Sequence, residues 1–133
     1  MTADELKAKL PDAFCEYGID ASYEELVGLM CDEVLLQVDD DDYQGDSRLL
    51  IRKGSQIGLL IFGWGSCSGC DALQACVDYE DLARLFAELE QSIRWDDAAG
   101  MLAFFRAHDW AGDYSHDPSF VAHGIELLAE RCA

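Results

Sequence analysis

Two cysteines separated by two residues, Cys67 and Cys70, stand in the glycine-rich segment FGWGSCSGCD at positions 62–71. A Cys-x-x-Cys pair can close a disulfide, supply two ligands to a metal ion, or hold a thiolate of lowered pKa. The segment lies between an apolar run and a helical pattern that begins near Asp71. This order predicts Cys67 at a helix N-terminus, where backbone amides stabilise a thiolate. The spacing alone leaves the three chemistries open.

Cys76 lies six residues beyond Cys70, so this is the densest group of metal-capable side chains in the chain. Structural zinc sites use four Cys or His ligands, and their usual signature is two closely spaced pairs. Here one pair occurs, and the three histidines are spaced too widely to form a second. We therefore predict no cofactor, with Cys67 and Cys70 reduced, metal-free and packed at a corner between a strand and a helix. A zinc site is the alternative.

The order of strand, Cys-x-x-Cys and helix resembles the local arrangement of thioredoxin-type proteins, which implies thiol–disulfide exchange. The rest of the pattern differs, because thioredoxin-like folds place the pair in a βαβ unit and here short strands precede it. The two prolines, Pro11 and Pro118, offer no cis-proline partner. No catalytic residue is predicted, since neither a Ser-His-Asp arrangement nor a nucleophile elbow is recognisable in the sequence. Thiol chemistry is the alternative to a non-enzymatic role.

A second candidate site is an acidic segment that we expect to connect two strands. An EF-hand is excluded, because Ile51 stands where a calcium loop needs its bidentate Glu and because strands flank the segment. A run of like charges at a hairpin tip is either a solvated surface or a contact for a cationic partner. The candidate partner-binding residues are Asp39, Asp40, Asp41, Asp42, Tyr43 and Asp46.

The net charge of −18 is unevenly distributed along the chain. Residues 1–46 carry 14 acidic side chains against two lysines, whereas residues 47–70 carry no acid and three bases. Such a charge repels nucleic acid, whose binding needs Lys and Arg at the phosphates. It attracts basic protein surfaces, including surfaces that normally hold DNA. The alternative is that the charge only maintains solubility.

The elements that must position these candidates are predicted from apolar periodicity and capping residues. Short, turn-rich connections between the strand-like runs favour a three-stranded antiparallel meander. The fold class is therefore α+β, with about five helices packed on one face of the sheet as a single layer pair. The predicted strands are 35–38, 49–52 and 57–62. The predicted helices are 3–17, kinked or divided at Pro11, then 23–33, one from Asp78 to Ile93, one after Asp96, and one opened by Asp117-Pro118.

Length and composition predict one domain over residues 1–133, with neither a linker nor an internal repeat. The first ten residues are charged and amphipathic and do not form a signal peptide, and no apolar run reaches the ~18 residues of a membrane span. We therefore expect a soluble, cytoplasmic protein. In a reducing cytosol the six cysteines are expected to be thiols or ligands rather than a disulfide framework.

The segment FGWGSCSGCDAL at 62–73, with Ser92-Ile93-Arg94-Trp95 downstream, resembles a recurring phrase in small uncharacterised proteins of tailed phages and bacteria. The resemblance covers residues 42–115 and implies a phage or mobile-element context without an activity. Small, very acidic phage proteins often resemble DNA mimics that occupy the DNA channel of restriction, CRISPR or repair enzymes. The sequence thus favours a non-enzymatic acidic protein that engages a basic, nucleic-acid-binding partner, with the zinc or thiol-exchange role as the alternative.

Overall fold

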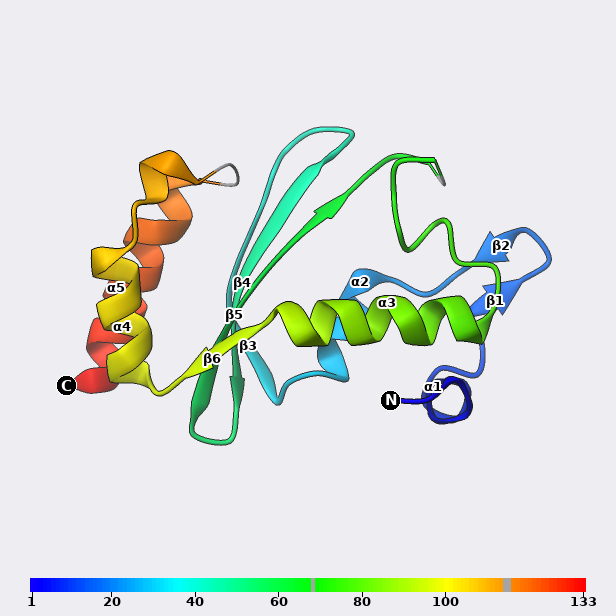
Figure 1. The fold of residues 1–133 in the computed structure, drawn as a ribbon, viewed down its shortest axis with the longest axis horizontal. Coiled ribbons are helices and arrows are strands. Elements are labelled where there is room, and N and C mark those ends of the chain that lie inside the picture. Colours follow the sequence, from blue (N-terminus) through cyan, green and yellow to red (C-terminus); the bar gives the residue numbers. More distant parts are fainter. Residues whose placement is uncertain (68, 114–115) are drawn as a thin grey trace.

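The computed structural model describes residues 1–67, 69–113 and 116–133 of the chain (Figure 1). Within these residues, five α-helices and six strands form an α+β fold, which confirms the predicted class. In chain order the elements are α1 (Ala3–Lys9), β1 (Phe14–Cys15), β2 (Gly18–Ile19), α2 (Tyr23–Gly28), β3 (Glu33–Asp39), β4 (Gly45–Lys53), β5 (Gln56–Trp64), α3 (Tyr79–Ser92), β6 (Arg94–Asp96), α4 (Ala98–Ala107), the 3-10 turn η1 (Trp110–Gly112) and α5 (Pro118–Cys132).

The main sheet has four antiparallel strands in the order β3-β4-β5-β6. Its long hairpin β4–β5 pairs Leu49 with Leu60 and, at its open end, Gly45 with Trp64. The three-stranded meander was therefore an incomplete prediction, because β6 adds a fourth strand that pairs Trp95 with Gly58. A three-residue strand is too short to show an alternating pattern, so its pairing partner determines it rather than its own sequence.

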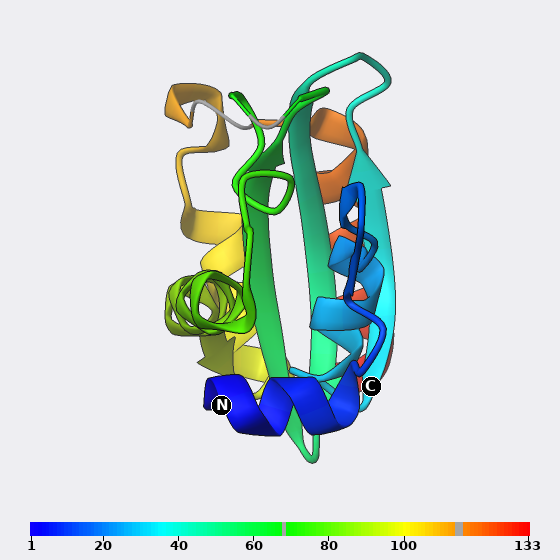
Figure 2. The same ribbon diagram turned by 90° about the vertical axis from the view of Figure 1, so that its right-hand side faces the viewer.

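Helices cover both faces of this sheet, with α1, α2 and α3 on one side and α4 and α5 on the other (Figures 1 and 2). Side chains of β4 and β5 alternate between the two cores: Leu49 and Leu60 belong to the first, and Leu50 and Leu59 to the second. The predicted single layer pair was wrong for this reason. Near-continuous apolar runs are typical of strands that are buried on both faces.

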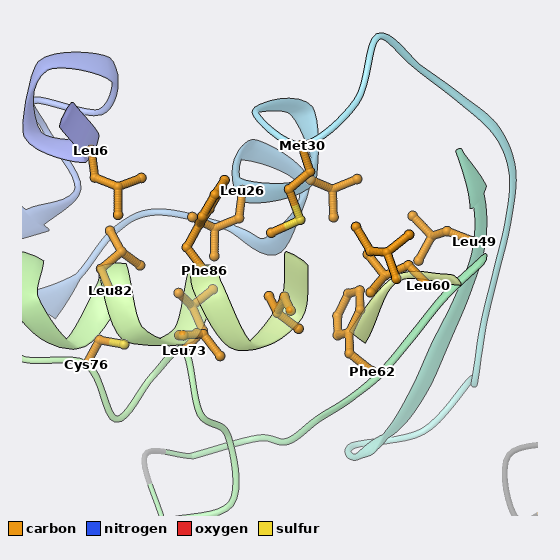
Figure 3. Packing of buried hydrophobic residues seen from close by; sticks show 14 of the residues in the cluster. Leu6, Leu26, Met30, Leu49, Leu60, Phe62, Leu73, Cys76, Leu82 and Phe86 are labelled. Atoms are coloured by element: carbon orange, nitrogen blue, oxygen red, sulfur yellow. The ribbon is translucent and has the colours of Figure 1, made fainter. Parts of the chain in front are cut away.

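The first core lies between the sheet and the helices α1, α2 and α3. Figure 3 shows Leu6 of α1 pointing toward Leu82 of α3. Leu6, Leu82 and Phe86 are each at most 1% exposed. Burying such side chains contributes roughly 1.5–3 kcal/mol each, so these contacts hold α1 against α3.

The second core lies between the sheet and the antiparallel pair α4 and α5. Its centre is aromatic: the Phe105 ring contacts Trp110 at 5.1 Å and Phe120 at 5.7 Å between centroids. The indole N–H of Trp110 donates to the Phe105 carbonyl at 2.8 Å, which satisfies the polar atom of a buried ring.

Helix starts agree with the capping residues in the sequence. Thr2 and Ser22 each form a capping box with the glutamate three residues later. Asp117 caps α5, whose first residue is Pro118 as predicted. These starts were predictable because an N-cap hydrogen bond joins residues only three apart.

Helix ends agree less well with the predictions. The first helix stops at Lys9, so Pro11 divides this segment rather than kinking it, because proline cannot continue the helical hydrogen bonds. The small hairpin β1–β2 replaces the helix that was predicted beyond Pro11. The helix α2 ends at Gly28, and strand β3 begins at Glu33. Within the described ranges, no helix is long and apolar enough to cross a membrane.

Candidate functional site

The two segments singled out from the sequence lie at the same end of the sheet. The start of β4 pairs with the end of β5, so the β3–β4 connection and the segment after Trp64 are neighbours. Figures 1 and 2 show both connections at the top of the molecule. An open cleft of about 790 Å³ lies between them, and its lining includes Asp40, Asp46, Arg48, Trp64, Cys70 and His116. The register of β4 with β5 thus brings the acidic candidate residues close to the candidate cysteines.

Asp40 points inward and stabilises the hairpin itself. Its carboxylate lies 2.9 Å from Nη1 of Arg48, whose side chain is only 4% exposed. The other carboxylate oxygen accepts the backbone N–H of Asp46 at 2.9 Å. The Asp46 amide and the Arg48 guanidinium together hold the pKa of Asp40 below its usual value. Gly45 is required beside them, since a Cβ at Gly45 would lie 2.7 Å from the Asp40 carboxylate.

The remaining acids of the run face solvent. Asp39, Asp41 and Asp42 are exposed, whereas Asp46 is only partly accessible. Tyr43 stands among them with 83% of its surface exposed. The Asp42 carboxylate accepts the backbone N–H of Tyr43 at 2.7 Å, which fixes the turn at this point. Of the six predicted partner-binding residues, the outward-facing ones are therefore three carboxylates and one phenol.

Cys67 and Cys70 are both exposed free thiols, and their sulfur atoms lie 2.9 Å apart. The backbone N–H of Cys67 also donates to Cys70 Sγ at 3.3 Å. These hydrogen bonds, first from the Cys67 thiol and then from its amide, lower the pKa of Cys70. Cys70 is therefore stabilised as a thiolate.

The predicted position of the pair was wrong in two respects. No helix begins at Cys67 or Cys70: a turn over residues 72–75 follows, and α3 starts only at Tyr79. The thiols are also not packed at a corner, because their side chains lie on the surface. The local amide and thiol hydrogen bonds replace the helix N-terminus as the cause of the lowered pKa.

Asp71 holds in place the turn that carries Cys67 and Cys70, called the cysteine turn below. This role of Asp71 was not predicted from the sequence. Its buried carboxylate accepts the backbone N–H of Gly65 at 2.9 Å, the N–H of Leu73 at 2.8 Å and the hydroxyl of Tyr23 at 2.9 Å. An Asp that opens a helical pattern is a signal for local amide bonds. The contact with Tyr23 had no such signal, because the two residues are 48 positions apart.

Gly65 lets the chain pass close to Cys70. A Cβ on Gly65 would lie 2.7 Å from Cys70 Sγ and closer still to the Cys70 carbonyl oxygen. The carbonyl of Gly65 also accepts the side-chain amide of Gln74 at 3.0 Å. The glycine is needed for close approach rather than for a left-handed conformation, since the positive-φ glycines are Gly18 and Gly54.

Cys76 is a core residue and does not join the other two cysteines. It is 5% exposed and packs in the first core together with Leu73 and Leu82 (Figure 3). Burial raises the pKa of its thiol to about 11. No group of three or more His, Cys, Asp or Glu side chains converges as a metal site within residues 1–67, 69–113 and 116–133. The zinc alternative stays a prediction.

Comparison with protein-family models, curated proteins and solved structures finds no match for this chain. The chemistry of the site has two parts: an exposed tyrosine ringed by carboxylates, and an exposed dithiol whose second sulfur lines the adjoining cleft. The first can bind a cationic surface, and the second can exchange disulfides.

Proposed function

We propose that this chain is a non-enzymatic binding protein whose β3–β4 hairpin engages a basic protein surface. The observation that carries the proposal is the arrangement at the hairpin tip, where Tyr43 is 83% exposed among the exposed carboxylates Asp39, Asp41 and Asp42. Tyrosine is enriched at the energetic centres of protein interfaces, because it buries a large ring with little loss of conformational entropy.

The surrounding charge supports a cationic partner. The chain carries a net charge of −18, so its field accelerates encounters with basic surfaces and opposes encounters with acidic ones. Rim charges act mainly on the association rate, whereas a buried aromatic anchor acts mainly on dissociation. The carboxylates should therefore affect mainly the association rate, and Tyr43 mainly the dissociation rate.

The partner class that we propose is a nucleic-acid-binding protein. Its basic surface ordinarily neutralises phosphates, and an array of carboxylates offers it charges of the same sign. The inward ion pair between Asp40 and Arg48 stabilises the hairpin that presents this array. If the chain occupies a DNA channel, duplex DNA and the chain compete for the same partner.

The experiment compares two exposed tyrosines. Tyr17 is 91% exposed and lies in the small β1–β2 hairpin region, so Tyr17→Ala is a matched control for Tyr43→Ala. Each chain is immobilised, exposed to a bacterial lysate, washed with increasing salt and analysed by quantitative mass spectrometry. We expect a basic protein that is retained by the original chain and by Tyr17→Ala, and reduced at least ~10-fold by Tyr43→Ala.

Competition then tests the partner class. Duplex DNA added at increasing concentration should release the retained protein from the chain, because both ligands use the same basic surface. A retained protein that is indifferent to both Tyr43→Ala and DNA would refute the proposal. Equal losses for Tyr17→Ala and Tyr43→Ala would refute the role of the hairpin.

A further inference from the structure

We propose that Cys67 and Cys70 form a reversible dithiol–disulfide pair that exchanges with small disulfides carrying positively charged ends. This activity is separate from the binding role of the hairpin and does not depend on it. It uses the two exposed thiols and the cleft that Cys70 lines.

The geometry places the thiols close to bonding distance. Their sulfur atoms are 2.9 Å apart, and a disulfide requires ~2.05 Å, so the sulfurs need to approach by about 1 Å. Both side chains are accessible to a reagent. The carbonyl of Cys67 accepts the N–H of Cys70 at 3.0 Å, which closes the turn and holds the two residues together. The dithiol is therefore preorganised for intramolecular closure.

The neighbouring structure supports the pair without blocking it. The buried Asp71 carboxylate anchors the turn through the Gly65 amide, so the backbone around the thiols is fixed from one side. Gly69, between the two cysteines, has free space, since a Cβ there would lie 3.9 Å from Cys67 Sγ. Asp71 thus anchors the chain next to Cys70, while both thiols stay exposed.

Cys70 is the attacking residue. It accepts the hydrogen bonds from Cys67, and these lower the pKa of its thiol. The Cys70 thiolate attacks one sulfur of the small disulfide, forms a mixed disulfide and releases one thiolate, which takes up a proton. Cys67 then loses its proton and attacks Cys70 Sγ, which expels the second small thiol. The protein loses two electrons and two protons, and the small disulfide gains them as two thiols.

Charge selects the substrate class. The residues that line the cleft beside Cys70 include Asp40, Asp46 and Arg48; Asp40 and Arg48 form an ion pair at 2.9 Å, so their charges offset each other and Asp46 adds a negative charge. The net charge of −18 adds a long-range field of the same sign. A disulfide with ammonium ends is drawn to this cleft, whereas a disulfide with carboxylate ends is repelled.

The test uses cystamine as the cationic disulfide and oxidised glutathione as the anionic one. The exposed Cys15 and Cys132 and the partly accessible Cys31 are first replaced by Ser, so that they do not react. The reduced chain is mixed with each disulfide, quenched with acid and weighed by intact mass spectrometry. We expect cystamine to yield a chain that has lost two hydrogen atoms and carries no added cysteamine. Oxidised glutathione should react at least ~10-fold more slowly at low salt, with a smaller ratio at ~1 M salt where screening is nearly complete.

Two single variants assign the roles. In Cys67→Ser the reaction should stop at one cysteamine on Cys70, and in Cys70→Ser the rate should fall at least ~10-fold, because the stabilised thiolate is gone. Thermal unfolding of both variants checks that the fold is kept. Equal rates for the two variants, a stable mixed disulfide on the unmodified pair, or faster reaction with oxidised glutathione would each overturn the proposal.

Discussion

Nη1 of Arg48 lies 2.9 Å from Oδ1 of Asp40, and this buried guanidinium removes one carboxylate from an otherwise exposed acidic run. Four consecutive aspartates therefore have two different roles. Asp40 stabilises the hairpin, while Asp39, Asp41 and Asp42 remain at its surface.

Asp40→Asn should destabilise the chain, and Asp41→Asn should not. Both changes alter the net charge equally, but only the first removes a charge from beside the buried Arg48 and weakens the acceptor for the Asp46 amide. We expect a loss of roughly 1–2 kcal/mol for Asp40→Asn and a change within about 0.5 kcal/mol for Asp41→Asn. Urea unfolding followed by tryptophan fluorescence measures both. Equal effects of the two substitutions would show that the ion pair does not contribute to the stability of the chain.

Two glycines of the cysteine turn should respond differently to alanine. Gly65→Ala places a methyl group 2.7 Å from Cys70 Sγ and should cost about 1–3 kcal/mol of unfolding free energy, because the backbone must move. Gly69→Ala meets its nearest atom at 3.9 Å and should be tolerated. Thermal unfolding compares the two. A stable Gly65→Ala chain would mean that the turn is looser than its contacts indicate.

Cys76 should make stability fall in alkaline solution. The thiol stays neutral in the folded chain until its pKa of about 11, whereas in the unfolded chain it ionises near 9. The contribution of the neutral thiol to the free energy of unfolding is therefore complete below pH 9. It is lost as pH rises toward 11, by at most about 3 kcal/mol. The free energy of unfolding, measured with urea across this pH range, should fall less steeply for Cys76→Ala than for the original chain.

Leu73→Ala is the control for that measurement. Leu73 packs in the same core as Cys76 but does not titrate, so its loss should lower the free energy of unfolding equally at each pH. Burial also raises the pKa of Cys31 and of Tyr23, so some alkaline loss should persist in Cys76→Ala. If Cys76→Ala and the original chain show parallel curves, the thiol does not stay neutral in the fold.

Chain purified under reducing conditions without a chelator should contain much less than one zinc per molecule. Cys67 and Cys70 supply two ligands, and Cys76 lies in the core instead of joining them. Structural zinc sites normally need four ligands. Elemental analysis by plasma mass spectrometry measures the content. One zinc per chain, lost on Cys70→Ser, would contradict this expectation and favour the zinc alternative.

The parts of the fold that were predictable from sequence are those set by neighbours along the chain. The caps at Ser22 and Asp117 depend on hydrogen bonds to residues three positions later, so their patterns predicted two helix starts correctly. Strand β6 depends on pairing of Trp95 with Gly58, and no local pattern could indicate it. The second layer of helices was missed because the helices were expected on one face, although near-continuous apolar runs such as those of β4 and β5 are typical of strands buried on both faces.

The candidate site shows the same division. Composition and spacing identified Cys67, Cys70 and the acidic run as neighbours of turns. The inward orientation of Asp40 and the anchoring of the turn by Tyr23 through Asp71 depend on contacts across the fold. The thiolate was assigned to Cys67 because a helix was expected there, whereas the actual turn directs hydrogen bonds to Cys70.

The association rate of the retained basic partner, measured against salt concentration, tests the proposed binding function most directly. For the original chain we predict a rate that falls at least ~10-fold between low and ~1 M salt, because exposed charges steer the encounter and salt screens them. Replacing Asp39, Asp41 and Asp42 together by Asn should slow association at low salt and reduce this salt dependence, because the charges nearest the contact are lost, and it should leave thermal unfolding nearly unchanged. Identical salt dependences for the original and the threefold-substituted chain would contradict a binding role for the hairpin.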